Sequence, residues 1–438
     1  MKSIPHFNNP TPWTAGQKIA FRFFFIYLTL QVLTENFLGP VFGFSQAGFT
    51  IGASIFTRPC LWLNRHFFHF NYIPAYWSTF SESLHTIRDI LYLLLAMLAC
   101  LLWSFLDRKR THYVKLHYWF SQALVIGLSG IVFAYAVIKI CPLQMPTPSV
   151  TTLQQQLGDL NPFRLLWATF GYGKPYQVFS GLVELSGAIL ILFRRTRLAG
   201  LLIIVPAFVN IILLNYSYQV GVMITSFYIL FIALFLLVSY GGPLWRPLFA
   251  GAPSTPQPPP YRPGKNFKTT LFRVISYLIL GLSFFLSLQE VYKTYRRVEA
   301  VNRTRQYSLI KQHIVNNDSL PLTEKDTLRW RVWGERITGG KRMVSIITMN
   351  PSVFKTYSLD RDTVRHVLTL RASGGKDTIP LKFNYTFLNK TDWELEGIVG
   401  QSNLKLELQR ILPDSTFPLL KKERRFIVFD DLSDGSDE

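Results

Sequence analysis

The chain has 438 residues, of which 49% are hydrophobic and 15% aromatic, and it carries a formal net charge of +20. Residues 1–290 contain 21 Lys and Arg against 7 Asp and Glu, and most of the basic residues lie in short segments between apolar runs. That pattern follows from membrane topology, and no basic stripe or recognition motif accompanies it, which excludes nucleic acid as a partner. The composition therefore indicates a protein whose main partner is the lipid bilayer.

Seven apolar stretches have the length of about 17–23 residues that a bilayer requires. They cover residues 18–35, 86–106, 117–140, 176–193, 198–215, 222–240 and 270–290. Arg22 lies near the start of the first stretch, where its long side chain could extend to the lipid headgroups. With the N-terminus inside, fifteen Lys and Arg fall in inner segments and six in outer ones, as the positive-inside rule requires. We therefore predict a multi-pass protein of the bacterial inner membrane, with its C-terminal domain in the periplasm.

Two outer segments are more than simple loops. Residues 36–85 contain the aromatic run Leu61–Phe70, followed by Tyr72, Tyr76 and Trp77, which suits a helix at the headgroup level. Residues 143–175 begin with a Pro-rich turn and continue as a capped, short amphipathic piece over 158–171. Either segment could cover a cavity between the spans.

Beyond the seventh stretch the sequence predicts a soluble β domain. Leu404, Leu406 and Leu408 alternate with polar residues, as in a half-buried strand. Gly339-Gly340, Gly374-Gly375 and Gly400 mark hairpin turns between about six strands, which is typical of a small antiparallel sandwich or barrel.

The predicted fold class is an α-helical multi-pass membrane protein with a small all-β C-terminal domain. The expected regions are N-terminal spans with an outer interfacial loop (1–115), a helical membrane core (116–245), a Pro-rich linker (246–269), the last span with a polar helical extension (270–320), a soluble β domain (321–425) and an acidic tail (426–438).

Glu184 is the main candidate for a functional position, because a carboxylate inside an apolar stretch normally faces a protein interior. A helical wheel places it on a small and polar face with Gln177, Ser180, Gly181, Gly187 and Ala188. Its candidate partners in an intramembrane polar site are Lys139, Asn210, Asp159 and Arg164. The carboxyl group could carry a proton or bind a polar ligand, or it could form a structural hydrogen bond to another span. The sequence has no motif for a metal or a nucleotide, and it does not identify a catalytic residue.

Several motifs between residues 139 and 240 resemble the DoxX-like family of membrane proteins. They are Lys139–Pro148, Gly158-Asp159, Leu166–Gly171, Gly181-Leu-Val-Glu184 with Gly187, and Phe193–Thr196 with Gly200. The resemblance is to long members with extra N-terminal spans and a C-terminal β domain, and it implies a four-helix core over residues 116–245. Some relatives are assigned as a subunit of a thiosulfate:quinone oxidoreductase, so the resemblance also allows a quinone as cofactor. This chain departs from the long members at Tyr218–Met223, at Tyr228 and at Ser81–His85.

These observations favour an accessory or scaffold subunit of a cell-envelope complex, which implies protein partners and leaves a redox link open. One alternative is a quinone-linked oxidoreductase subunit in which Glu184 handles a proton. Another is a small-solute carrier, which the few polar groups within the spans disfavour.

Overall fold

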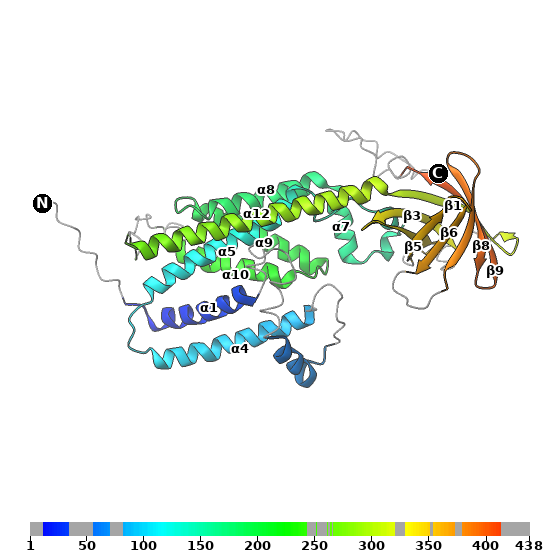
Figure 1. The fold of residues 1–438 in the computed structure, drawn as a ribbon. Coiled ribbons are helices and arrows are strands. Elements are labelled where there is room, and N and C mark those ends of the chain that lie inside the picture. The colour runs from blue at the N-terminus through cyan, green and yellow to red at the C-terminus, as the bar shows by residue number, and fades with distance from the viewer. Residues whose placement is uncertain are drawn as a thin grey trace. The chain divides into compact units, whose positions relative to one another are not determined.

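The computed structural model describes residues 12–34, 56–70, 82–242, 251, 261, 263–264, 266–319, 329–350, 354–372 and 379–412. The chain forms two compact units (Figure 1). The helical unit combines Met1–Gln144 with Lys174–Thr294, and the second unit combines Met145–Gly173 with Tyr295–Glu438. Tyr72, Tyr76, Trp77, Gly374-Gly375, the acidic tail and most of the Pro-rich linker lie outside the described residues.

The long helices follow the predicted apolar stretches. They are α1 (Ala15–Thr34), α4 (Glu82–Leu106), α5 (Val114–Ile140), α8 (Lys174–Leu190), α9 (Arg197–Ser217), α10 (Met223–Tyr240) and α12 (Phe267–Thr304). Five of them, α4, α5, α9, α10 and α12, are long and apolar enough to cross a membrane. The chain is therefore a multi-pass membrane protein.

The number of seven spans stays a prediction, because α1 and α8 are weaker candidates. Helix α8 has 17 residues, which makes it about 25 Å long, somewhat less than the hydrocarbon core of a bilayer. Helix α1 contains Lys18, Arg22 and Gln31, which lower its mean hydropathy.

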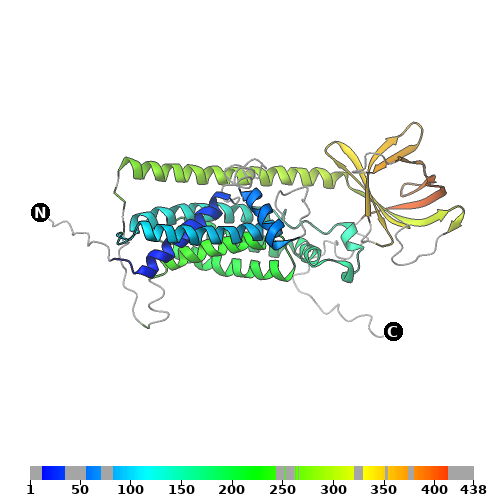
Figure 2. The same ribbon diagram turned by 90° about the horizontal axis from the view of Figure 1, so that it is seen from below.

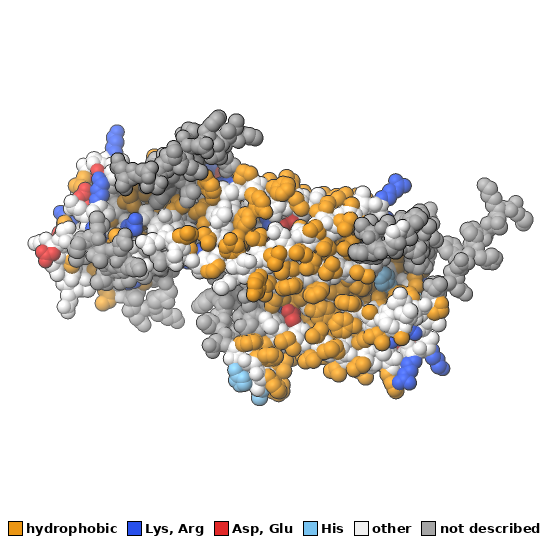
Figure 3. All heavy atoms as spheres, turned by 180° about the vertical axis from the view of Figure 1, so that it is seen from behind, with side chains coloured by type: hydrophobic (Ala, Val, Ile, Leu, Met, Phe, Trp, Pro, Cys, Tyr) orange, Lys and Arg blue, Asp and Glu red, His pale blue; other side chains and the backbone are white. Residues whose placement is uncertain are grey.

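Helix α5 lies at the centre of the helical unit. Most of its length is buried, whereas few residues of α4 and α12 are buried. Figure 2 shows α12 along one side of the helices, where Phe284 stacks on Phe133 of α5 with ring centroids 3.7 Å apart. Hydrophobic side chains spread over the surface of this unit in Figure 3. Leu101 and Leu106 of α4 are examples of exposed apolar side chains. An apolar outer surface is what hydrocarbon tails require.

The C-terminal strands form an eight-stranded antiparallel barrel. The strands are β1 (Gln306–Val315), β3 (Trp330–Thr338), β4 (Lys341–Thr348), β5 (Phe354–Asp362), β6 (Val367–Ala372), β7 (Leu381–Phe387), β8 (Asp392–Val399) and β9 (Ser402–Ile411), with the short β2 (Asp318–Ser319) beside β1. Each strand of the barrel pairs with the next, and β1 pairs with β9 to close it. Apolar side chains fill the interior, including Trp333 and Trp393 in edge-to-face contact.

The barrel confirms an all-β domain, but the prediction of a polar helical extension within residues 270–320 is wrong beyond Thr304. Helix α12 ends at Thr304, and β1 begins at Gln306. In β1, Ser308, Ile310 and His313 are buried while most of their neighbours are not. Those side chains are buried because β1 pairs with β3 on one side and with β9 on the other, which closes the barrel.

The segment between α5 and α8 packs against the barrel of the second unit. It contains α6 (Val150–Leu153), the short η2 (Leu157–Asp159) and α7 (Pro162–Tyr172). The side chains of Ser149 and Asn161 cap α6 and α7 by accepting hydrogen bonds from backbone N–H groups. Val150 is buried against Val332 and Ile347 on the outer face of the barrel. The amphipathic character of the segment was predicted, but this packing partner was not.

Candidate functional site

Glu184 is buried in the helical unit, as its helical wheel predicts. Its side chain is 1% exposed, and Oε1 accepts a hydrogen bond from Nζ of Lys139, which is also buried. Lys139 lies in the last turn of α5, and Glu184 lies in the middle of α8. Of the contacts proposed for the carboxylate, the one with Lys139 is formed. An ion pair of this kind compensates two charges that would otherwise be very costly in an apolar environment.

Glycines allow the helices around this pair to approach closely. A Cβ atom at Gly181 would lie 2.8 Å from the backbone oxygen of Ala136 and 2.9 Å from Cβ of Lys139. A Cβ at Gly187 would lie 2.7 Å from Cγ1 of Ile204 on α9. The two glycines of the Gly-x-x-Glu-x-x-Gly motif therefore bring α5 and α9 against α8 on either side of Glu184.

The other predicted partners of Glu184 do not join it. Asn210 has an exposed side chain on α9, so the Glu184–Asn210 contact is not formed. Arg164 belongs to the second unit, where it lines a cavity beside the barrel. The side chain of Asp159 lies outside the described residues. The polar site proposed from the sequence is therefore reduced to Glu184 and Lys139.

A second ionic cluster joins α1, α4 and α10. Oδ1 of Asp89 accepts hydrogen bonds from the hydroxyl of Tyr228 and from Nε2 of Gln31. Nη2 of Arg88 lies 3.3 Å from the Tyr228 hydroxyl and 3.7 Å from Oδ1 of Asp89. The guanidinium group of Arg88 also lies over the ring of Tyr92. Arg88, Gln31 and Tyr228 are buried, so a carboxylate, a guanidinium group and a phenol meet inside the bundle.

The positive-inside count places Arg88 among the six basic residues of the outer segments, so the sequence does not predict this cluster. One signal was present: adjacent Arg and Asp residues lie inside the second apolar stretch, 86–106. Charged residues at such positions are rare and usually have partners. The identity of those partners, Gln31 and Tyr228, could not be read from the sequence, because they come from helices far apart in the chain.

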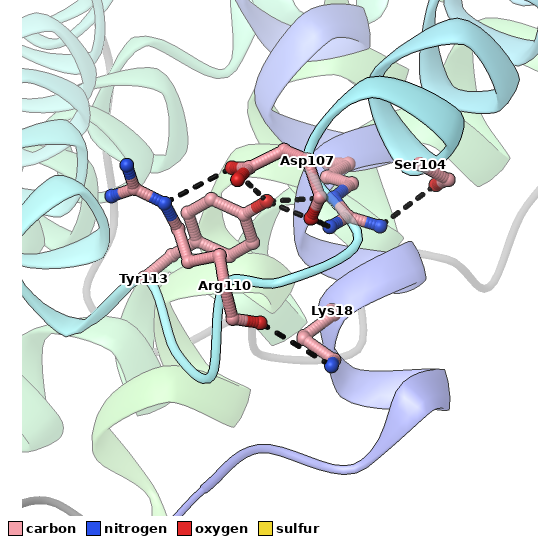
Figure 4. A network of polar contacts seen from close by, with 6 residues as sticks. Lys18, Ser104, Asp107, Arg110 and Tyr113 are labelled. Atoms are coloured by element: carbon pink, nitrogen blue, oxygen red, sulfur yellow. Dashed lines mark hydrogen bonds and ion pairs between the residues drawn. The ribbon is translucent and has the colours of Figure 1, made fainter.

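Arg22, in the N-terminal half of α1, forms a third polar network. Figure 4 shows its partners Ser104, Asp107 and Tyr113. Its guanidinium group donates to the hydroxyl of Tyr113, to Oγ of Ser104 and to the backbone oxygen of Asp107. Arg22 is 4% exposed, and these three acceptors hold its guanidinium group between helices. Whether it also lies at the level of the lipid headgroups stays a prediction.

The carboxylate of Asp107 completes this network. It accepts a hydrogen bond of 2.8 Å from the Tyr113 hydroxyl and lies 3.0 Å from Nε of Arg110. The Tyr113 hydrogen bond is the main reason that the pKa of Asp107 lies below its ordinary value. The network fastens α1 to the turn between α4 and α5.

The comparisons with known proteins do not establish a family. No protein-family profile matches the chain, and no solved structure matches it. The chain is similar to the uncharacterized protein YwoB of Bacillus subtilis (strain 168), with 35% identity over 91 residues. That match covers 19% of this chain and 59% of YwoB, so the chain spans less than two thirds of this relative.

Proposed function

We propose that this protein is an accessory or scaffold subunit of a bacterial cell-envelope complex, anchored in the inner membrane by its helical unit. The proposal rests on the buried ion pair between Glu184 and Lys139. Each group satisfies the charge of the other, and close helix packing at Gly181 surrounds them. An ion pair used in this way supports helix association rather than turnover of a substrate.

The proposed orientation places the N-terminus inside and the β-barrel in the periplasm. It requires α1 and α8 to cross the membrane with the five longer helices, and it agrees with the excess of Lys and Arg in the inner segments. The motifs around Gly181 and Glu184 support membership of the DoxX-like family. The roles of Gly181 and Gly187 in helix packing supply a physical reason for that motif.

The proposal is tested by purifying the tagged full chain from its native host in a mild detergent. A scaffold subunit is expected to retain one or more partner proteins in fixed stoichiometry, and Glu184→Gln should reduce that yield by disturbing the α5–α8 contact. Lys405→Met, which removes an exposed cation of the barrel, is the matched control. The proposal is contradicted if the chain purifies without partner proteins both with and without chemical cross-linking before extraction.

The orientation has a separate test. A reporter enzyme that is active only in the periplasm, fused after Glu438, is expected to be active. A fusion that is active only as a cytoplasmic reporter contradicts the periplasmic location, whatever the partners are.

A second candidate function, a quinone-linked oxidoreductase subunit, is favoured by the cluster of Asp89, Arg88 and Tyr228. A carboxylate that accepts a hydrogen bond from a phenol within the bundle can pass a proton to or from a redox-active ring. In this candidate Asp89, rather than the ion-paired Glu184, handles the proton. Purified protein should then contain bound quinone, and Tyr228→Phe should lower its content; quinone-free protein from quinone-replete membranes contradicts it.

A further inference from the structure

The second unit contains a cavity between the barrel and the segment that precedes α8. Its volume is about 400 Å³, which is within the range of small-molecule sites. One wall is the outer face of β1, β3, β4 and β5, and the other is formed by residues 146–168. We name it the flank pocket, after its place beside the barrel, and define it by Arg164, Trp167, Arg305, Tyr307, Arg336 and Ser345.

Three guanidinium groups line the flank pocket. Arg164 lies in the first turn of α7, and Arg305 lies between α12 and β1. Neither side chain has an ion-pair partner among the residues that the structure describes. Arg336 donates from Nη1 to Oγ of Ser345, at 3.1 Å. Three separate parts of the chain therefore each contribute a guanidinium group to the lining of this cavity.

The carboxylate that borders the pocket does not cancel this charge. Glu335 is a lining residue, but its Oε1 accepts hydrogen bonds of 2.9 Å from Nε1 of Trp333 and Nη2 of Arg361. Trp333 is part of the barrel core, so the hydrogen bonds of this carboxylate are made with side chains of the barrel and not with the cavity. The charge available to a ligand in the flank pocket is consequently positive.

The pocket also has an apolar side. The rings of Phe163 and Trp167 pack with centroids 4.1 Å apart along α7, and both residues line the cavity. A Cβ atom at Gly171 would lie 2.1 Å from the backbone oxygen of Pro146, so only glycine lets α7 pass this close to the Pro-rich turn. A second cavity of about 480 Å³ also borders Arg305 and Tyr307. The flank pocket therefore combines a cationic wall with an apolar one.

We propose that the flank pocket binds a phosphate-bearing amphiphile. Guanidinium groups match the geometry of phosphate oxygens and bind them by charge-assisted hydrogen bonds. The hydroxyls of Ser345 and Thr356, 3.4 Å apart, add further donors. The aromatic pair on α7 receives the apolar part of the ligand. This inference is independent of the accessory role, because binding can be measured on the purified chain alone.

The test uses the full chain in phosphatidylcholine nanodiscs, with dihexanoyl phosphatidic acid and inorganic phosphate as soluble probes. The amphiphile is expected to bind at least tenfold more tightly than inorganic phosphate. Arg164→Gln and Arg305→Gln should each weaken its binding about tenfold. Both side chains are exposed, so the variants should fold, which thermal unfolding checks. Trp167→Leu should weaken binding of the amphiphile and leave that of inorganic phosphate unchanged.

Arg371→Gln is the matched control, because it removes the same charge from an exposed position on β6 outside the pocket. The proposal is overturned if neither probe saturates at millimolar concentration, if inorganic phosphate binds as tightly as the amphiphile, or if the Arg164 and Arg305 variants bind like Arg371→Gln. Nanodiscs containing phosphatidylglycerol separate the two sources of the ligand. Competition with the probe supports a site for a bilayer lipid, and absence of competition supports a site for a soluble amphiphile.

Discussion

Lys139, in the last turn of α5, donates a hydrogen bond from Nζ to Oε1 of Glu184 on α8, and both side chains are buried. The pair connects two helices that also touch at Gly181 and through the bond of 2.8 Å from Ser129 Oγ to the backbone oxygen of Ala188. The ion pair, the close backbone approach at Gly181 and the hydrogen bond from Ser129 thus all stabilise the contact between α5 and α8. The free energy of unfolding of the helical unit should depend strongly on each of them.

Breaking the buried pair on one side should be much more harmful than removing it entirely. Glu184→Gln or Lys139→Met alone leaves one charged group buried without its partner, which should lower the free energy of unfolding by about 3–5 kcal/mol. The double variant Glu184→Leu with Lys139→Met should recover most of that loss. Denaturant unfolding in mixed micelles measures the cycle.

The control for this cycle is an exposed ion pair of the barrel. Lys405 and Glu394 lie 2.9 Å apart with the lysine 45% exposed, so Lys405→Met should lower the free energy of unfolding far less than either single variant of the buried pair. Additive losses in the Glu184 and Lys139 variants would show that the two groups act separately.

Gly181 should tolerate no side chain. Gly181→Ala places a methyl group 2.8 Å from the backbone oxygen of Ala136, and that backbone cannot move without shifting α5. We expect a loss of about 1–3 kcal/mol, as for overpacked cores. Gly281 on α12 has no neighbouring atom within 4 Å of its would-be Cβ, so Gly281→Ala is the matched control. Equal thermal stability of the two variants would disprove the close approach.

The network around Asp107 predicts a dependence of stability on pH. The Tyr113 hydrogen bond is the largest of the causes that hold the pKa of Asp107 below 3.8, its ordinary value. A carboxyl group whose pKa is lower in the folded state stabilises fully above its unfolded pKa, and this effect is lost as the pH falls through the folded pKa. Wild type should therefore exceed Asp107→Asn in melting temperature at neutral pH, with a difference that shrinks below pH 3.8.

Tyr113→Phe supplies the second half of that test. It removes the hydroxyl that bonds Asp107, so the pKa of Asp107 should move back toward its ordinary value. The pH-dependent loss should then be smaller than in wild type, and it should be complete at a higher pH, because the folded and unfolded pKa values of Asp107 lie closer together. A difference in melting temperature that stays constant across the acidic range would contradict this account.

The turn between β3 and β4 should require its two glycines. Thr338 pairs with Lys341, so Gly339 and Gly340 form a two-residue hairpin turn, and their φ angles are +58° and +74°. Alanine at either position should destabilise the barrel by about 1–2 kcal/mol, because its Cβ strains a left-handed backbone. Asparagine should cost less than alanine at the same position. Urea unfolding followed by tryptophan fluorescence tests this order.

Local patterns were enough to predict much of the fold. Apolar length predicted the positions of the long helices, because a bilayer imposes that length on each span. Alternation of Leu404, Leu406 and Leu408 predicts β9. In β5 such a signal is lacking, because Lys355, Asp360 and Arg361 interrupt its apolar pattern. The count of membrane spans stays a prediction.

The sequence by itself determined that Glu184 faces inward, because Gly181, Gly187 and Ala188 share its helical face and lipid excludes a carboxylate. Only the tertiary structure decided its partner: α5 packs against α8 with Lys139 toward the carboxylate, while α9 turns Asn210 outward. Tertiary structure also paired Asp89 with Tyr228 and placed Arg164 beside the barrel. Periodicity reports which face of an element is buried, but the choice of neighbour depends on contacts between residues far apart in the chain, which no local pattern records.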